Sequence, residues 1–336
     1  MYKNIFKNLI AIVIGVFIFF IIGEIYFRFI NPQDNMEFVG DKKLYWIAKP
    51  NQKSRILMGN GSHWSPLTTV NSMGLRGDEI TIKPNEKRIL FLGDSFTFGE
   101  GVGDDETTPS WFLKILNKNN INGYRIINGG MRGWGVFQMQ RLLYNNFNKF
   151  DPNIVVLIYK ESDELRQPFK TDLEVEQYLK KHRFQRQIRK ISKFVTWIYR
   201  KIVVIKLQRQ HKGAENYISE ADALEREKLI STDIIRLHSI NEFCKKNNTY
   251  FLLVGWLEGN QSEMFKKKLE EISEIDNIPL LLTGDSLFPK KYSTNDLKIV
   301  NDGHPTALAH KINAQMIFDK IKQLNWFDET SFTKGN

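Results

Sequence analysis

The sequence predicts an α/β protein in which helices cover both faces of one parallel sheet, preceded by a single membrane-spanning helix. Three observations support this prediction. From residue 88 onward, short apolar segments alternate with longer amphipathic segments. Several short segments, such as 154–159, are apolar throughout, as expected for strands buried on both faces. The segment 9–23 near the N-terminus is apolar without interruption.

The apolar N-terminal segment continues past Glu24 to Phe27. At 1.5 Å per residue it extends roughly 29 Å, enough to cross the hydrocarbon core of a bilayer. Glu24 and Arg28 lie near one end, where they can pair or reach the headgroups. No small-x-small cleavage site follows, so residues 1–31 are predicted to be an uncleaved signal anchor. Because the leading tail is short, residues 32–336 are expected outside the cytoplasmic membrane.

The rest of the chain divides into an extension and a larger domain. Residues 32–87 are rich in Asn, Gly, Pro and Ser and predict an irregular, partly β extension. Residues 88–330 predict the domain. Its expected strands are 89–92, 124–127, 154–159, 250–255 and 278–282, and its expected helices are 110–116, 138–146, 219–246, 264–272 and 306–324.

The net charge of +10 comes from one window. Residues 181–212 hold eleven Lys and Arg and no acid, which leaves the remainder of the chain near −1. Apolar residues repeat there at steps of four and three, which predicts an amphipathic helix within a basic insertion at about 166–246. It would either lie on an anionic membrane, beside the active site, or pack on its own domain. No nucleic-acid recognition motif accompanies the charge, so we expect no nucleic-acid partner.

Composition excludes several classes of protein. With 42% hydrophobic and 26% charged residues, the chain is neither disordered nor a multi-span membrane protein. Its one cysteine, Cys244, excludes an intramolecular disulfide framework and a cysteine-cluster zinc site. No histidine has metal-ligand spacing, so no metal and no cofactor are predicted. The sequence leaves the oligomeric state open.

Two short motifs carry candidate chemistry. Ser95 follows the first predicted strand of the domain, in Gly93-Asp94-Ser95, so its hydroxyl is expected at the carboxyl edge of the sheet. A serine needs a base oriented by an acid, and Asp302 and His304 precede the last helix. Each motif alone is weak, and 284–286 repeats Gly-Asp-Ser after the fifth strand, where we expect no nucleophile.

In combination, four blocks resemble the SGNH hydrolases, also called GDSL-type esterases. The blocks are the run around Ser95, the loop 128–133 (NGGMRG), the strand leading to Asp163, and the Asp302/His304 motif. The resemblance covers residues 88–324 apart from the basic insertion. The stretch from 71–77 (NSMGLRG) through Gly99 is similar to the membrane-anchored bacterial members.

This resemblance implies a three-layer, flavodoxin-like sandwich around a central parallel five-stranded sheet. It implies that Ser95 is the nucleophile, His304 the base and Asp302 the orienting acid. Asp302 fits a D-x-H form of the motif, whereas the commoner D-x-x-H form would place Asn301 in that role.

The oxyanion donors implied are the N–H groups of Ser95 and Gly133, with Ser162 at the position of the family's asparagine. Because a serine hydroxyl is shorter than an asparagine amide, weaker catalysis is one expectation. The function implied is ester hydrolysis on an O-acetylated envelope glycan or a lipid. The alternatives are an O-acyltransferase with the same triad, or a non-catalytic envelope binding or assembly factor that retains the fold.

Overall fold

The computed structural model divides the chain into two compact units, Met1–Asn35 with Thr171–Tyr217, and Met36–Lys170 with Ile218–Asn336. Each unit is described separately below. The residues that the structure describes are 2–30, 36–58, 63–83, 85–161, 163, 191–195, 197–198, 202, 220–258 and 263–327.

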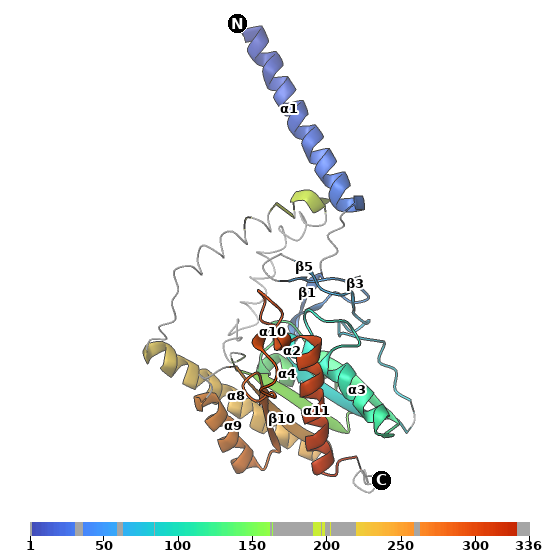
Figure 1. Cartoon of the computed structure of the whole chain (residues 1–336), viewed down its shortest axis with the longest axis vertical. Coiled ribbons are helices and arrows are strands. Elements are labelled where there is room, and N and C mark those ends of the chain that lie inside the picture. The colour runs from blue at the N-terminus through green and yellow to red at the C-terminus, as the bar shows by residue number, and fades with distance from the viewer. Residues whose placement is uncertain are drawn as a thin grey trace. The chain divides into compact units, whose positions relative to one another are not determined.

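The first unit begins with the predicted apolar helix. Helix α1 covers Tyr2–Ile25 and continues as the π-helical turn Tyr26–Ile30 (Figure 1). Its segment Ile5–Phe29 has a mean hydropathy of 2.7, and none of its most apolar 18-residue window is buried. It is therefore long and apolar enough to cross a membrane.

A short piece of the basic window packs against the end of this helix. Residues 193–195 and 197–198 are helical. The ring of Phe194 stacks on Phe27 at a centroid distance of 5.9 Å, and that of Trp197 stacks on Phe27 at 5.0 Å. Most of the window 181–212 lies outside the described residues, so the single amphipathic helix expected there stays a prediction.

Glu24 explains why the chain becomes helical at this point. Its carboxylate accepts hydrogen bonds from the Ser192 hydroxyl at 2.8 Å and from the N–H groups of Lys193 and Phe194 at 3.1 Å each. These N–H groups have no partner inside a helix that starts here, so the carboxylate caps it. Arg28 pairs with Glu24 at 2.5 Å and donates to the carbonyl of Ile191 at 2.8 Å.

The second unit is built on the predicted five-stranded sheet. Its order is β11-β10-β9-β7-β8, and all four pairings are parallel. The first of these strands in the chain therefore lies between the second and the third, as in flavodoxin-like sheets. The predicted fold class is confirmed. The strands are β7 (Lys87–Gly93), β8 (Tyr124–Gly130), β9 (Ile154–Lys160), β10 (Tyr250–Leu257) and β11 (Leu280–Gly284).

Helices cover both faces of this sheet and make it the middle of three layers (Figure 1). Alternation along β7 shows the two faces: Leu90 and Leu92 face one core, and Ile89 and Phe91 face the other. The Leu90 face is covered by α4 (Val136–Phe150), α8 (Glu220–Lys246) and α9 (Glu263–Asp276), and the Ile89 face by α3 (Thr108–Lys118) and α11 (Ala307–Gln323).

From Met36 onward the extension belongs to the same compact unit. Its described residues form three small antiparallel sheets, and several of its side chains join the core on the α4 face, among them Met36, Ile56 and Leu75. Its strands are β1 (Phe38–Asp41), β2 (Tyr45–Ala48), β3 (Lys53–Ser54), β4 (Leu57–Met58), β5 (His63–Trp64) and β6 (Thr68–Thr69).

Candidate active site

Ser95 is the first residue of the short helix α2 (Ser95–Phe98), which follows β7 directly. Asp94 caps this helix because its carboxylate accepts the N–H of Phe96 at 2.7 Å. Gly99 ends it in the left-handed conformation, with a φ of +82°. The turn therefore places Ser95 at the carboxyl end of a central strand, where ligands bind in open α/β sheets.

The structure brings His304 and Asp302 to Ser95 although they lie far along the chain. The Oγ–H of Ser95 donates to Nε2 of His304 at 2.9 Å. On the other side of the ring, Nδ1–H of His304 donates to Oδ1 of Asp302 in a short hydrogen bond. Asp302, rather than Asn301, is thus the acid that contacts the imidazole. This arrangement can remove a proton from the serine hydroxyl.

A tight turn between α10 (Thr294–Leu297) and α11 holds the histidine in place. The N–H groups of Asp302 and Gly303 both donate to the carbonyl of Ile299, at 3.1 and 3.0 Å. The N–H of Ile299 donates in return to the carbonyl of His304 at 2.8 Å. These backbone bonds fix the direction of the imidazole before any substrate binds.

Several carboxylates tune His304. Burial of the ring lowers its pKa, but the hydrogen bond to Asp302 and the negative charges of Glu100, Asp302 and Asp94 outweigh burial. The pKa of His304 is therefore raised above its ordinary value of 6.5. A base with a raised pKa has a stronger affinity for the proton that Ser95 must release.

The two predicted backbone donors lie on segments that pack together. The N–H of Met131, at the start of the loop that carries Gly133, donates to the carbonyl of Gly93 at 3.1 Å. Gly133 has a φ of +76°. The N–H groups of Ser95 and Gly133 donate to no group in the described part of the chain. Both are available to an oxyanion.

The third predicted donor cannot be placed, because Ser162 lies outside the described residues. Its neighbour Asp163 is fully buried and accepts the N–H of Lys160 at 3.1 Å. The role of Ser162 stays a prediction.

The extension contacts the loop that carries Gly133. The indole N–H of Trp46 donates to the carbonyl of Arg132 at 2.9 Å, and that of Trp134 donates to the carbonyl of Trp46 at 3.1 Å. A Cβ placed on Gly133 would lie 3.4 Å from the Trp46 ring. The sequence gives no sign of this contact, because residues 46 and 132 are far apart in the chain.

Arg76 fixes the backbone that follows Ser95. The Arg76 side chain is buried; it donates to the carbonyls of Phe98 (3.0 Å), Gly99 and Val102 (2.7 Å), and pairs with Asp104 at 2.9 Å. Arg76 belongs to the segment 71–77, so that segment positions the turn after α2 rather than contacting Ser95 itself.

Glu100 lies within the site, and the sequence reasoning missed it. Its Oε2 lies 3.8 Å from Nε2 of His304, and its Oε1 lies 3.3 Å from the Arg132 guanidinium. The side chain is 2% exposed. The signal that could have found it is an acid in the Gly-Glu-Gly turn directly after α2.

Phe96 and Trp134 are buried, and Phe96 packs on His304 at a centroid distance of 5.5 Å. The second Gly-Asp-Ser copy and Cys244, both named from the sequence, lie away from Ser95. The second Gly-Asp-Ser copy follows β11, which β10 and β9 separate from β7. Its Asp285 pairs with Lys298 at 2.6 Å. Burial raises the pKa of Cys244 to about 12, so its thiol is inert.

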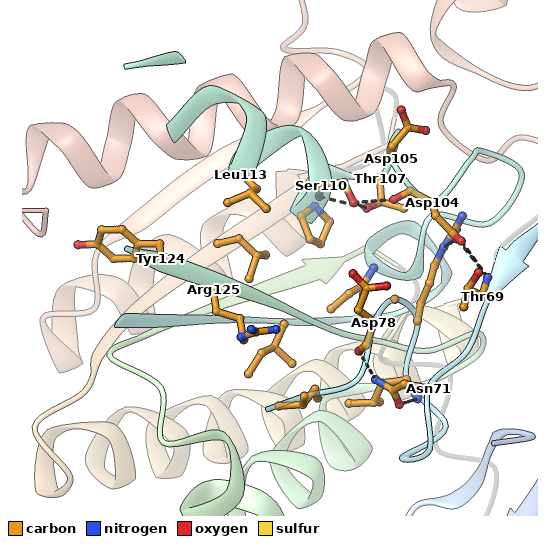
Figure 2. Close-up of a pocket in the computed structure, with 18 of the residues that line it drawn as sticks. Thr69, Asn71, Asp78, Asp104, Asp105, Thr107, Ser110, Leu113, Tyr124 and Arg125 are labelled. Atoms are coloured by element: carbon orange, nitrogen blue, oxygen red, sulfur yellow. Dashed lines mark hydrogen bonds and ion pairs between the residues drawn. The ribbon is translucent and has the colours of Figure 1, made fainter. Parts of the chain in front are cut away.

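A cavity of about 540 Å³ lies away from the triad, between the extension, α3 and the edge strand β8. Figure 2 shows Asp104 and Thr69 on one side and Tyr124 and Arg125 on the other. Charged side chains around it pair with one another: Arg125 with Glu86 at 2.8 Å and Lys114 with Asp105 at 3.0 Å.

Within the part of the chain that the structure describes, no cluster of three His, Cys, Asp or Glu side chains could hold a metal ion.

No protein-family model matches the chain, and no curated protein matches it. Among solved structures, TesA is 14% identical, over 71% of this chain and 99% of its own, with a TM-score of 0.46. The psychrotrophic esterase EstA from Pseudoalteromonas sp. is 15% identical, over 71% of this chain and 99% of its own, with a TM-score of 0.46. A protein from Desulfitobacterium hafniense, described as lipolytic and of the G-D-S-L family, is 12% identical. The match covers 70% of this chain and 99% of that protein, with a TM-score of 0.41. Likeness at this level assigns no activity, so the assignment depends on the geometry of the site.

Proposed function

We propose that this protein is a membrane-anchored serine ester hydrolase of the SGNH type, with Ser95 as nucleophile, His304 as base and Asp302 as orienting acid. The observation that carries the proposal is the 2.9 Å contact between Ser95 Oγ and His304 Nε2, with Asp302 on the other ring nitrogen. Nucleophile, base and acid are arranged in the order that acyl transfer requires.

In the first half of the reaction, Ser95 Oγ attacks the carbonyl carbon of the ester and its proton passes to Nε2 of His304. The resulting oxyanion is stabilised by the N–H groups of Ser95 and Gly133, with Ser162 as a predicted third donor. Loss of one such donor costs about 3–4 kcal/mol of transition-state stabilisation. The imidazolium then returns the proton to the leaving alcohol, and the acyl group remains on Ser95.

In the second half, water replaces the alcohol. His304 takes a proton from the water as its oxygen attacks the acyl carbon. Ser95 Oγ then leaves with that proton, and the carboxylic acid is released. Asp302 keeps the imidazole in the tautomer that has a free Nε2 lone pair and stabilises its charged form.

The substrate proposed is an acyl ester on an envelope glycan or a lipid. Support comes from the segment Ile5–Phe29, which is long and apolar enough to cross a membrane and would hold the protein there. The cap that Glu24 provides to the N–H groups of Lys193 and Phe194 supports a location of this aromatic segment at the headgroup level of the same anchor. The catalytic unit is proposed to lie outside the cytoplasm.

The test is p-nitrophenyl acetate turnover by the full chain in detergent, with fluorophosphonate labelling in parallel. Ser95→Ala is expected to lower turnover by at least about 10³-fold and to abolish labelling. Ser286→Ala is the matched control, because it removes the serine of the second Gly-Asp-Ser copy, and it should behave as wild type. Equal turnover by wild type and Ser95→Ala would instead favour a non-catalytic binding protein.

A further inference from the structure

Glu100 presents an unused carboxylate oxygen to the reactive side of His304. Its Oε2 is buried, accepts no hydrogen bond from any described group, and lies 3.8 Å from Nε2. Most buried polar atoms have a hydrogen-bond partner, and a buried carboxylate oxygen without one is energetically costly. The direction of Oε2 toward Nε2 points to a ligand that sits between the two atoms.

The other carboxylate oxygen is already engaged. Oε1 lies 3.3 Å from the guanidinium of Arg132, and the N–H of Glu100 donates to the carbonyl of Ser95 at 3.0 Å. Arg76 holds the carbonyls on either side, at Gly99 and Val102. Side chain and backbone are therefore both fixed, which keeps Oε2 directed at the imidazole.

We propose that Glu100 Oε2 binds and orients the water that hydrolyses the acyl-enzyme; the role rests on the function proposed above. Two hydrogen bonds of about 2.8 Å each, made by one water oxygen, span the 3.8 Å between Oε2 and Nε2. The water donates one O–H to Nε2 and the other to Oε2. Its lone pair then faces the acyl carbon on Ser95.

The step balances with these groups alone. The bond from the water oxygen to the acyl carbon forms while one water proton moves to Nε2. The other proton remains on the oxygen and stays hydrogen-bonded to Oε2. When the tetrahedral intermediate collapses, the bond to Ser95 Oγ breaks and Oγ takes the proton from Nε2. Glu100 remains ionised throughout and acts by orientation and charge.

The role predicts that deacylation depends on Glu100 more than acylation does. In acylation the serine hydroxyl contacts Nε2 directly at 2.9 Å and needs no second acceptor. In Glu100→Gln, the amide oxygen is expected to keep the contact with Arg132, because the amide NH₂ would be repelled by the guanidinium. The NH₂ group then faces the water site and cannot accept its proton.

The test uses the full chain in detergent, in excess over p-nitrophenyl acetate, so that each enzyme turns over once. Release of p-nitrophenol reports acylation, and decay of acetyl-Ser95, followed by quenched-flow mass spectrometry, reports deacylation. For Glu100→Gln we expect acylation within about threefold of wild type and deacylation slower by about 10–100-fold. Glu37→Gln, which removes a carboxylate from an exposed pair with Lys49, is the control and should change neither rate.

Equal slowing of both steps by Glu100→Gln would overturn the proposal, because it would show that Glu100 only positions His304 or the loop. Glu100→Asp provides a second variant that keeps the charge and withdraws the oxygen by one methylene. It should also slow deacylation selectively, and unchanged deacylation in this variant would overturn the proposal too. If the wild type forms no acetyl-Ser95 at all, the proposed function itself fails, which is a different result from equal slowing.

Discussion

Trp134 donates its indole N–H to the backbone carbonyl of Trp46 at 3.1 Å, while the indole of Trp46 donates to the carbonyl of Arg132 at 2.9 Å. These reciprocal hydrogen bonds join the extension to the loop that carries Gly133. The extension therefore supports the position of Gly133, the proposed oxyanion donor.

Trp46→Phe tests this support. The substitution keeps an aromatic ring, although a smaller one, and removes one N–H···O bond worth about 1 kcal/mol, so we expect kcat/KM for p-nitrophenyl acetate to fall about fivefold. Thermal unfolding should change little, because the Arg132 carbonyl is close to solvent. Trp64→Phe, in β5 of the same extension, is the control and should leave kcat/KM unchanged. An unaltered kcat/KM for Trp46→Phe would show that the loop that carries Gly133 keeps its position without the hydrogen bond from Trp46.

Asp302→Asn and Asn301→Gly should separate the two positions that the sequence offered for the residue that orients His304. Asparagine keeps the shape but no longer holds the required tautomer of His304, so kcat/KM is expected to fall by about 10³–10⁴-fold. Asn301 has a φ of +60°, so Asn301→Gly is tolerated there and should retain activity. A large loss in Asn301→Gly with none in Asp302→Asn would contradict the assignment. Steady-state kinetics at one pH decide between the two outcomes.

The pH profile of kcat/KM should reflect the raised pKa of His304. The base must be neutral to accept the serine proton, so activity is lost as pH falls through the pKa of this histidine. Because Asp302, Glu100 and Asp94 together raise that pKa, the midpoint of the acid limb is expected above pH 6.5. In Glu100→Gln one negative charge is removed and the midpoint should move to lower pH. A wild-type midpoint at or below 6.5 would be inconsistent with this arrangement.

Glu24→Gln should loosen the segment that packs on the end of α1. The carboxylate accepts two backbone N–H groups there, and hydrogen bonds to a charged group contribute about 1.5–3 kcal/mol each. We expect the amides of Lys193 and Phe194 to exchange with solvent deuterium at least about tenfold faster in detergent. Glu242→Gln, in an exposed pair with Lys245 on α8, is the control. Equal exchange in wild type and Glu24→Gln would show that the cap is dispensable.

Much of the sheet could be predicted because each of its strands is a short apolar run that can be recognised in the sequence alone. The strand expected at 154–159 is Ile154–Lys160, and the helix expected at 306–324 is Ala307–Gln323. The last strand was expected at 278–282 and lies at Leu280–Gly284, two residues later. Ile278 is buried in the core but precedes the strand, so an apolar run alone misplaces the start.

The support of the site could not be predicted in the same way. Ser95, Asp302 and His304 stand in recognisable local motifs, and the structure brings all three together. Glu100 and Trp46 act through contacts with residues far along the chain, and a charged or aromatic residue in a loop carries no local sign of such a contact. Only the folded structure shows that Glu100 lies 3.8 Å from His304 and that Trp46 donates to the carbonyl of Arg132.

Ser95 and His304 are separated by 209 positions, and the strands β9, β10 and β11 all lie between them in the chain. During synthesis the apolar helix therefore leaves the ribosome long before the imidazole does. If the apolar helix is the membrane anchor proposed above, it can be inserted while Ser95 still has no base. Because contacts of such long sequence separation form late in folding, the proposed activity would begin only after insertion. Under the proposed function, this order of synthesis would keep the chain inactive toward acyl esters until it reaches its membrane.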